Sequence, residues 1–98
     1  MITLLACAAA RPLSADAVYA VSARERRGEV TLTVELVDGW HLNREYPSGF
    51  ESDAGQVVDL TVDADHLGHL VAPAEAGTLH LGFCEAERCR IEHVRYPR

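Results

Sequence analysis

The sequence predicts an all-β fold from two observations. Apolar residues alternate with polar ones at a period of two in three separate runs, and clusters of glycine, proline and aspartate interrupt the chain between these runs. Beyond the alanine-rich start, no window of about eleven residues repeats apolar residues at the three- and four-residue spacing of an amphipathic helix. We therefore expect strands joined by turns along the whole chain.

The expected strands follow one another in a regular order. A weak apolar run covers residues 17–23, and clear alternating runs cover residues 29–36, 58–62 and 79–83. In each clear run the apolar residues share one face, which predicts strands with one buried and one solvated side. The buried sides would be formed by Val30, Leu32, Val34, Leu36, Val58, Leu60, Val62, Leu79, Leu81 and Phe83.

Turn-forming residues predict the connections. The pair Asp38-Gly39 favours positive φ, so we expect a hairpin between residues 36–37 and 40–42. Residues 43–56 and 65–76 have the composition of loops. About six or seven short strands with turns every 8 to 12 residues predict an antiparallel β-sandwich of immunoglobulin type, with Trp40 in its core.

Length and charge exclude several classes of function. A chain of 98 residues supports one small domain. It carries 15 acidic and 9 basic residues, and the resulting net charge of -6 repels nucleic acid and anionic lipid headgroups. No apolar stretch reaches the roughly 18 residues that a membrane-spanning helix needs. We expect neither nucleic-acid binding nor a membrane span.

The amino terminus has features of an export signal. Residues 4–7 read Leu-Leu-Ala-Cys, which has the form of a bacterial lipoprotein cleavage box with Cys7 as the lipidated residue. We interpret residues 1–13 as a leader or a disordered terminus, and residues 14–98 as the folded domain. A lipid anchor at Cys7 would place the protein in the periplasm or elsewhere in the bacterial cell envelope, where disulfides form and persist.

The remaining cysteines, Cys84 and Cys89, are separated by four residues and lie where two alternating runs meet. The simplest arrangement is a hairpin in which the two cysteines face each other, so that a disulfide between them is geometrically plausible. The same register places three residue pairs on one face of the hairpin: Cys84 with Cys89, Gly82 with Ile91, and His80 with His93.

Three interpretations of the cysteine pair compete. A structural disulfide would close a loop of about six residues and stabilise the fold by only about 2 kcal/mol. A metal site would need two more ligands, but His80 and His93 lie four residues, or about 13 Å, from the cysteines, so one ion cannot reach all four. A short exposed disulfide at a hairpin tip suits thiol–disulfide exchange.

The site residues that we predict are therefore Cys84 and Cys89, with no cofactor and no metal. Besides thiol–disulfide exchange and a module with a purely structural disulfide, a third possible function is copper or zinc handling through the histidines. We expect His66 and His69 to be solvated rather than to hold a cation.

Two segments resemble the amino-terminal periplasmic domain of the thiol:disulfide interchange protein DsbD. They are Val37-Asp38-Gly39-Trp40-His41-Leu42 and the stretch from Gly77 through Cys84 and Cys89 to Pro97. The resemblance implies an immunoglobulin-like sandwich that passes electrons between a thioredoxin-like partner and other thiol proteins, as a protein-disulfide reductase would. It also implies that Cys84 and Cys89 are the exchanging pair, that Cys89 forms the mixed disulfide, and that Phe50 or Tyr46 shields the cysteines.

The alternative function is a non-enzymatic binding or assembly module with an immunoglobulin-like fold, in which the hairpin disulfide is structural. The reduction potential separates the two, since a value above about -250 mV favours exchange and one below about -300 mV favours a structural bond.

Overall fold

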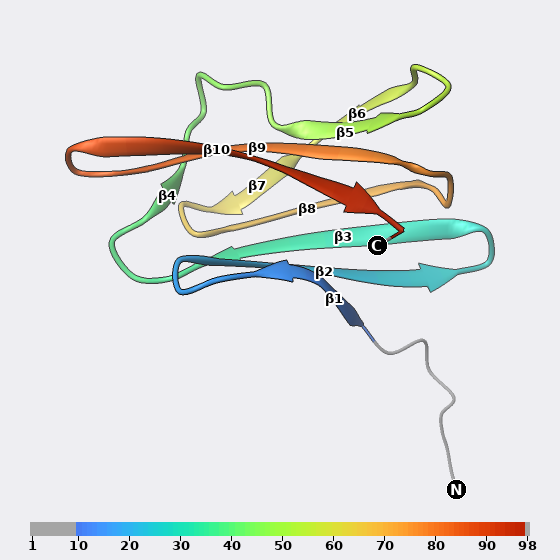
Figure 1. Cartoon of the computed structure of the whole chain (residues 1–98), viewed down its shortest axis with the longest axis horizontal. Coiled ribbons are helices and arrows are strands. Elements are labelled where there is room, and N and C mark those ends of the chain that lie inside the picture. Colours follow the sequence, from blue (N-terminus) through green and yellow to red (C-terminus); the bar gives the residue numbers. More distant parts are fainter. Residues whose placement is uncertain (1–9, 98) are drawn as a thin grey trace, which may run out of the picture.

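The computed structural model describes residues 10–97, which form ten β-strands in two antiparallel sheets (Figure 1). No helix among these residues is long and apolar enough to cross a membrane. The first sheet has the order β1 (Arg11–Ala15), β2 (Tyr19–Arg26), β3 (Glu29–Leu36), β8 (Leu67–Pro73) and β7 (Thr61–Ala64). The second has the order β10 (Arg88–Tyr96), β9 (Gly77–Glu85), β5 (Gly49–Ser52) and β6 (Val57–Asp59), and β4 (His41–Leu42) also pairs with β9.

The two sheets enclose one hydrophobic core, which confirms the all-β sandwich. The alternating run of residues 29–36 forms β3, and its apolar residues are buried. Arg27 and Gly28 both have positive φ, as a tight turn between twisted strands requires, and they connect β2 to β3 as a hairpin. Both sheets contribute to the core, which includes Val21, Val30, Leu32, Val34, Leu36, Trp40, Phe50, Leu79, Leu81 and Phe83.

The hairpin expected at Asp38-Gly39 is wrong, although the turn itself is present. Gly39 has a φ of 92°, and the Trp40 amide donates to the Val37 carbonyl at 3.2 Å. The turn carries the chain from β3 in the first sheet to β4 in the second, where His41 pairs with Cys84. It therefore joins the two layers instead of two neighbouring strands.

The run of residues 58–62, expected as one strand, is divided at Leu60. Residues before Leu60 form β6 in the second sheet, and residues after it form β7 in the first. The Leu60 amide donates to the carbonyl of Ser48 at 3.0 Å instead of joining either ladder. The alternation of apolar residues continues through Leu60 because Val58 in the second sheet and Val62 in the first both pack against the shared core, as Leu60 does between them.

Both segments expected as loops contain strands. Residues 43–56 include β5, and residues 65–76 include β8, which lies inside the first sheet between β3 and β7. The ten strands among residues 10–97 exceed the six or seven expected.

The amino-terminal boundary also differs from the expectation. Strand β1 begins at Arg11, so the sandwich starts before the expected residue 14. Cys7 and the cleavage box lie outside the described residues.

Candidate functional site

The candidate site is the disulfide near the tip of the β9–β10 hairpin. Cys84 and Cys89 face each other across the ladder and form a disulfide with an S–S distance of 2.04 Å. The predicted register is confirmed, because Gly82 also pairs with Ile91 and His80 with His93. Pairing extends one step beyond the cysteines, to Glu85 and Arg88, so the connecting turn is shorter than expected.

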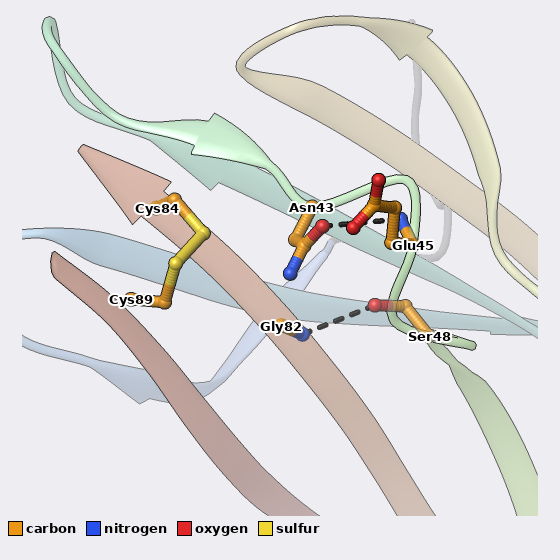
Figure 2. Close-up of a disulfide and its surroundings, with 6 residues drawn as sticks. All are labelled: Asn43, Glu45, Ser48, Gly82, Cys84 and Cys89. Carbon is orange, nitrogen blue, oxygen red and sulfur yellow. Dashed lines mark hydrogen bonds between the residues drawn. A yellow bond between two sulfur atoms is a disulfide. The ribbon is translucent and has the colours of Figure 1, made fainter. Parts of the chain in front are cut away.

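The two sulfurs occupy different surroundings. Strand β9 lies inside the second sheet, between β10 on one side and β4 and β5 on the other, whereas β10 is an edge strand. Cys84 is accordingly 8% exposed, while Cys89 is exposed to solvent. Figure 2 shows the disulfide bridging the two strands, with Cys89 on the outer one. A second molecule can therefore reach the Cys89 sulfur more readily than the Cys84 sulfur.

The arginines beside Cys89 point to the other face of the hairpin. Because side chains alternate along a strand, Arg88 and Arg90 lie on the face opposite the cysteines. Arg88 pairs with Glu85 and lies over the Trp40 ring, 5.5 Å from its centroid. Neither arginine is thus directed at the sulfurs.

Arg90 covers the end of the core. It donates to Asp16 at 2.7 Å and to Glu92 at 2.8 Å, and its guanidinium lies 5.7 Å from the Tyr19 centroid and 5.5 Å from that of Phe83. The hydrogen bond from Arg90 lowers the pKa of Asp16 below its usual value, and backbone hydrogen bonds from Val18 and Tyr19 act in the same direction. These contacts fasten the edge strand β10 to the turn between β1 and β2.

His41 is a neighbour of the disulfide that sequence reasoning did not place at the site. It pairs with Cys84 from the β4 side, opposite to Cys89, so the three residues form one row across the sheet. Directly opposed residues have β-carbons about 4.5–5.5 Å apart and share a face, which places the exposed His41 side chain next to Cys84. No local sequence pattern predicts this contact, because β4 and β9 are far apart in the chain.

Tyr46 packs beside the site, two residues along β9 from Cys84. A β-carbon at Gly82 would lie 2.5 Å from Cγ of Tyr46, so the tyrosine ring packs directly on the Gly82 backbone. Gly82 precedes Cys84 by two residues and therefore shares its face. The expectation for Phe50 is wrong, because its side chain is 1% exposed and packs in the core against Tyr96.

The loop that carries Tyr46 is fastened to β9 by hydrogen bonds. The Asn43 amide donates to the Gly82 carbonyl at 2.9 Å, and the Gly82 amide donates to Oγ of Ser48 at 3.1 Å. The Asn43 side chain in turn accepts from the Glu45 amide at 3.0 Å. Figure 2 shows this loop beside the disulfide.

The histidines other than His41 lie away from the cysteines. His80 and His93 contact each other further along the hairpin, with 2.8 Å between their Nδ1 atoms. His66 is exposed, and His69 pairs with Asp63 at 2.6 Å. Within residues 10–97, no group of three or more His, Cys, Asp and Glu side chains is arranged to hold a metal ion.

Comparison with known proteins adds no relative. No protein-family model, no curated protein and no solved structure matches this chain. The resemblance to the DsbD domain stays a prediction, and the disulfide with its neighbours His41, Gly82 and Tyr46 is the part of the described fold with the clearest chemical content.

Proposed function

We propose that this domain exchanges its Cys84–Cys89 disulfide with a thiol pair of a partner protein, as a protein-disulfide reductase of the bacterial cell envelope. The observation that supports the proposal is the inequality of the two sulfurs. Cys89 is exposed on an edge strand, while Cys84 is nearly buried on an inner one. Thiol–disulfide exchange needs one sulfur that an incoming thiolate can reach and a second one that can leave.

The exchange has two steps. A thiolate of the partner attacks Sγ of Cys89, forms a mixed disulfide with it and breaks the bond to Cys84, whose sulfur leaves as a thiolate. The second thiolate of the partner then attacks the partner's own sulfur in the mixed disulfide and releases the Cys89 thiolate. The partner becomes oxidised to a disulfide, and the domain is reduced to a dithiol by the same two electrons. The reverse sequence passes these electrons to an oxidised protein.

His41 and Tyr46 bear on the first step. The side chain of His41 shares a face and a cross-strand position with Cys84, whose sulfur leaves, and an imidazole in that position can donate a hydrogen bond to the sulfur. Tyr46 limits approach along β9, so an incoming thiolate meets fewer obstacles from the β10 edge. Replacing His41 by Ala is accordingly expected to slow reduction of the disulfide without changing the fold, since the side chain is exposed.

The class of partner comes from the resemblance to the DsbD domain, which implies a thioredoxin-fold protein. The residues that carry this resemblance include the row of the site itself, namely His41, Cys84 and Cys89. The same resemblance favours the periplasm as the location.

A trapping experiment tests the proposal. The probe is a thioredoxin that lacks its second active-site cysteine and carries a thionitrobenzoate group on the first, so that attack by a free thiol releases a coloured product. Cys84→Ala leaves the exposed Cys89 free, and we expect it to react at least about tenfold faster than Cys89→Ala, in which only the buried Cys84 remains.

Cys89→Ala is the matched control, since both variants keep one thiol of the pair. The free thiol of Cys7 is removed from both by Cys7→Ser, so that only the hairpin thiol is measured. Equal rates for the two variants, or no reaction of either, would contradict the proposed attack at Cys89. A reduction potential below about -300 mV would favour the alternative, a binding or assembly module with a structural disulfide.

A further inference from the structure

A second cluster of functional side chains lies on the same face of the sheet. His80 on β9 and His93 on β10 are cross-strand partners, and their Nδ1 atoms are 2.8 Å apart. Glu51 on β5 completes the cluster, with Oε1 at 3.3 Å from Nε2 of His80. The rings meet nearly edge to face, with an interplanar angle of 78°.

Glu51 determines which nitrogen of His80 is free. A carboxylate oxygen only accepts hydrogen bonds, so the pair with Glu51 requires a proton on Nε2 of His80. In the neutral ring Nδ1 then carries a lone pair, and this lone pair faces Nδ1 of His93. The contact between the two rings therefore contains one proton, which comes from His93.

We propose that His80 and His93 chelate a divalent copper ion through their two Nδ1 atoms. The ion replaces the proton between them, and His93 takes up a proton from water at Nε2 as it loses the one on Nδ1, so that both rings stay neutral. Bonds from imidazole nitrogen to a divalent ion such as zinc are about 2.0–2.1 Å long. With 2.8 Å between the nitrogens, an ion at that distance from both would hold them at an angle of about 90°. Binding would turn each ring by about 45°, so that its lone pair points at the ion instead of at the other nitrogen.

That angle selects the metal. An angle near 90° is that between neighbouring ligands in the tetragonal geometry typical of Cu²⁺, whereas a tetrahedral zinc site needs the nitrogens further apart. Cu²⁺ also has the highest affinity of the divalent first-row metals for nitrogen ligands. Water would fill the remaining positions, since no third protein ligand among residues 10–97 shares the site.

Glu51 would not bind the metal itself but would hold the ring of His80, which does. Histidine ligands commonly donate their second ring nitrogen to a carboxylate, which fixes the tautomer and orients the ring. The hydrogen bond from Nε2 of His80 to Glu51 has this arrangement before any metal is bound.

The surroundings admit a cation. His93 is exposed, and the side chain of His80 is 31% exposed, so an ion can enter from solvent. The nearest cation on β10 is Arg95, whose two terminal nitrogens are held by Asp53 at 2.9 and 3.0 Å. The net charge of -6 further favours the approach of positive ions.

The copper site is independent of the exchange function. His80 lies four residues from Cys84 along β9, about 13 Å away, so metal binding does not require the sulfurs. The two proposals therefore succeed or fail separately when copper binding is measured with the disulfide intact.

Titration of the oxidised protein with Cu²⁺ tests the inference. The experiment uses calorimetry and electron paramagnetic resonance on a Cys7→Ser background, because a free thiol would bind or reduce copper. We expect one Cu²⁺ with nitrogen coupling from two imidazoles. His80→Ala and His93→Ala should each weaken binding by more than the roughly 10- to 100-fold that loss of an outer partner causes, and Glu51→Gln by an amount within that range.

His69→Ala is the matched control, because His69 also lies on a strand and contacts a carboxylate but has no histidine partner. Its copper affinity should equal that of the unmodified chain. His93→Gln keeps the size of the side chain and should lose copper while the far-ultraviolet circular dichroism stays unchanged. Unaltered affinity in His93→Gln, or an equal loss in His69→Ala, would overturn the proposed site.

Discussion

Reduction of the Cys84–Cys89 bond is expected to lower the free energy of unfolding by about 2 kcal/mol and to leave the domain folded. The cysteines are five positions apart, and the chain-entropy estimate for a loop of about six residues is about 2 kcal/mol at 25 °C. The rest of β9 does not depend on the bond, because Leu79, Leu81 and Phe83 are fully buried and the strand also pairs with β5 and β4. A domain of this size should lose about 10 °C in melting temperature.

Urea denaturation with and without reductant, followed by Trp40 fluorescence, measures this difference. The double variant Cys84→Ala/Cys89→Ala should match the reduced protein and should not respond to reductant. A loss of about 5 kcal/mol or more, or the absence of a cooperative transition after reduction, would refute the reasoning. The disulfide would then be a structural staple, and a domain that unfolds when reduced could not cycle between the two redox states.

Three further predictions concern the core, acid stability and the loop over the site. Phe83→Ala should destabilise the fold by about 3–5 kcal/mol in urea denaturation, and a loss below about 1 kcal/mol would contradict its burial. Folding lowers the pKa of Asp16 from its ordinary value of 3.8, so the ionised carboxylate stabilises the fold above that pH, and this contribution is lost as the pH falls through the lowered pKa. Asp16→Asn should therefore flatten the acid-induced loss of stability measured from pH about 5 to 2. Gly82→Ala should displace the ring of Tyr46 and speed reduction of the disulfide by dithiothreitol, and an unchanged rate would exclude shielding by Tyr46.

Local pattern predicts those parts of the fold in which large apolar residues mark the buried face. Strand β3 runs from Glu29 to Leu36 as expected, because branched and leucine side chains fill every inward position. Strand β8 was missed because small residues stand at its inward positions, including Gly68 and Ala72. At Gly68 the space of a side chain is taken by neighbours, since a β-carbon there would lie 3.1 Å from a methyl of Leu42.

The candidate site likewise contains one part that local sequence predicts and another that it does not. The pairing of Cys84 with Cys89 follows from a short hairpin, whose register is set by residues close in the chain. His41 and Tyr46 reach the site through contacts between distant segments, which periodicity does not encode. The sequence also predicts His80 opposite His93, but the contact of His80 with Glu51 depends on the pairing of β5 with β9.

The division of residues 57–64 at Leu60 makes the two sides of the sandwich mechanically unequal. Along one side the backbone itself passes from β6 to β7, so the layers cannot separate there without pulling these two edge strands out of their sheets. Along the other side, β10 and the β1–β2 turn are joined by side chains, chiefly Arg90 with Asp16. Transient opening should therefore begin on the side that carries Cys89, with Leu60 as the hinge, and amide hydrogens of β10 should exchange with solvent sooner than those of β9.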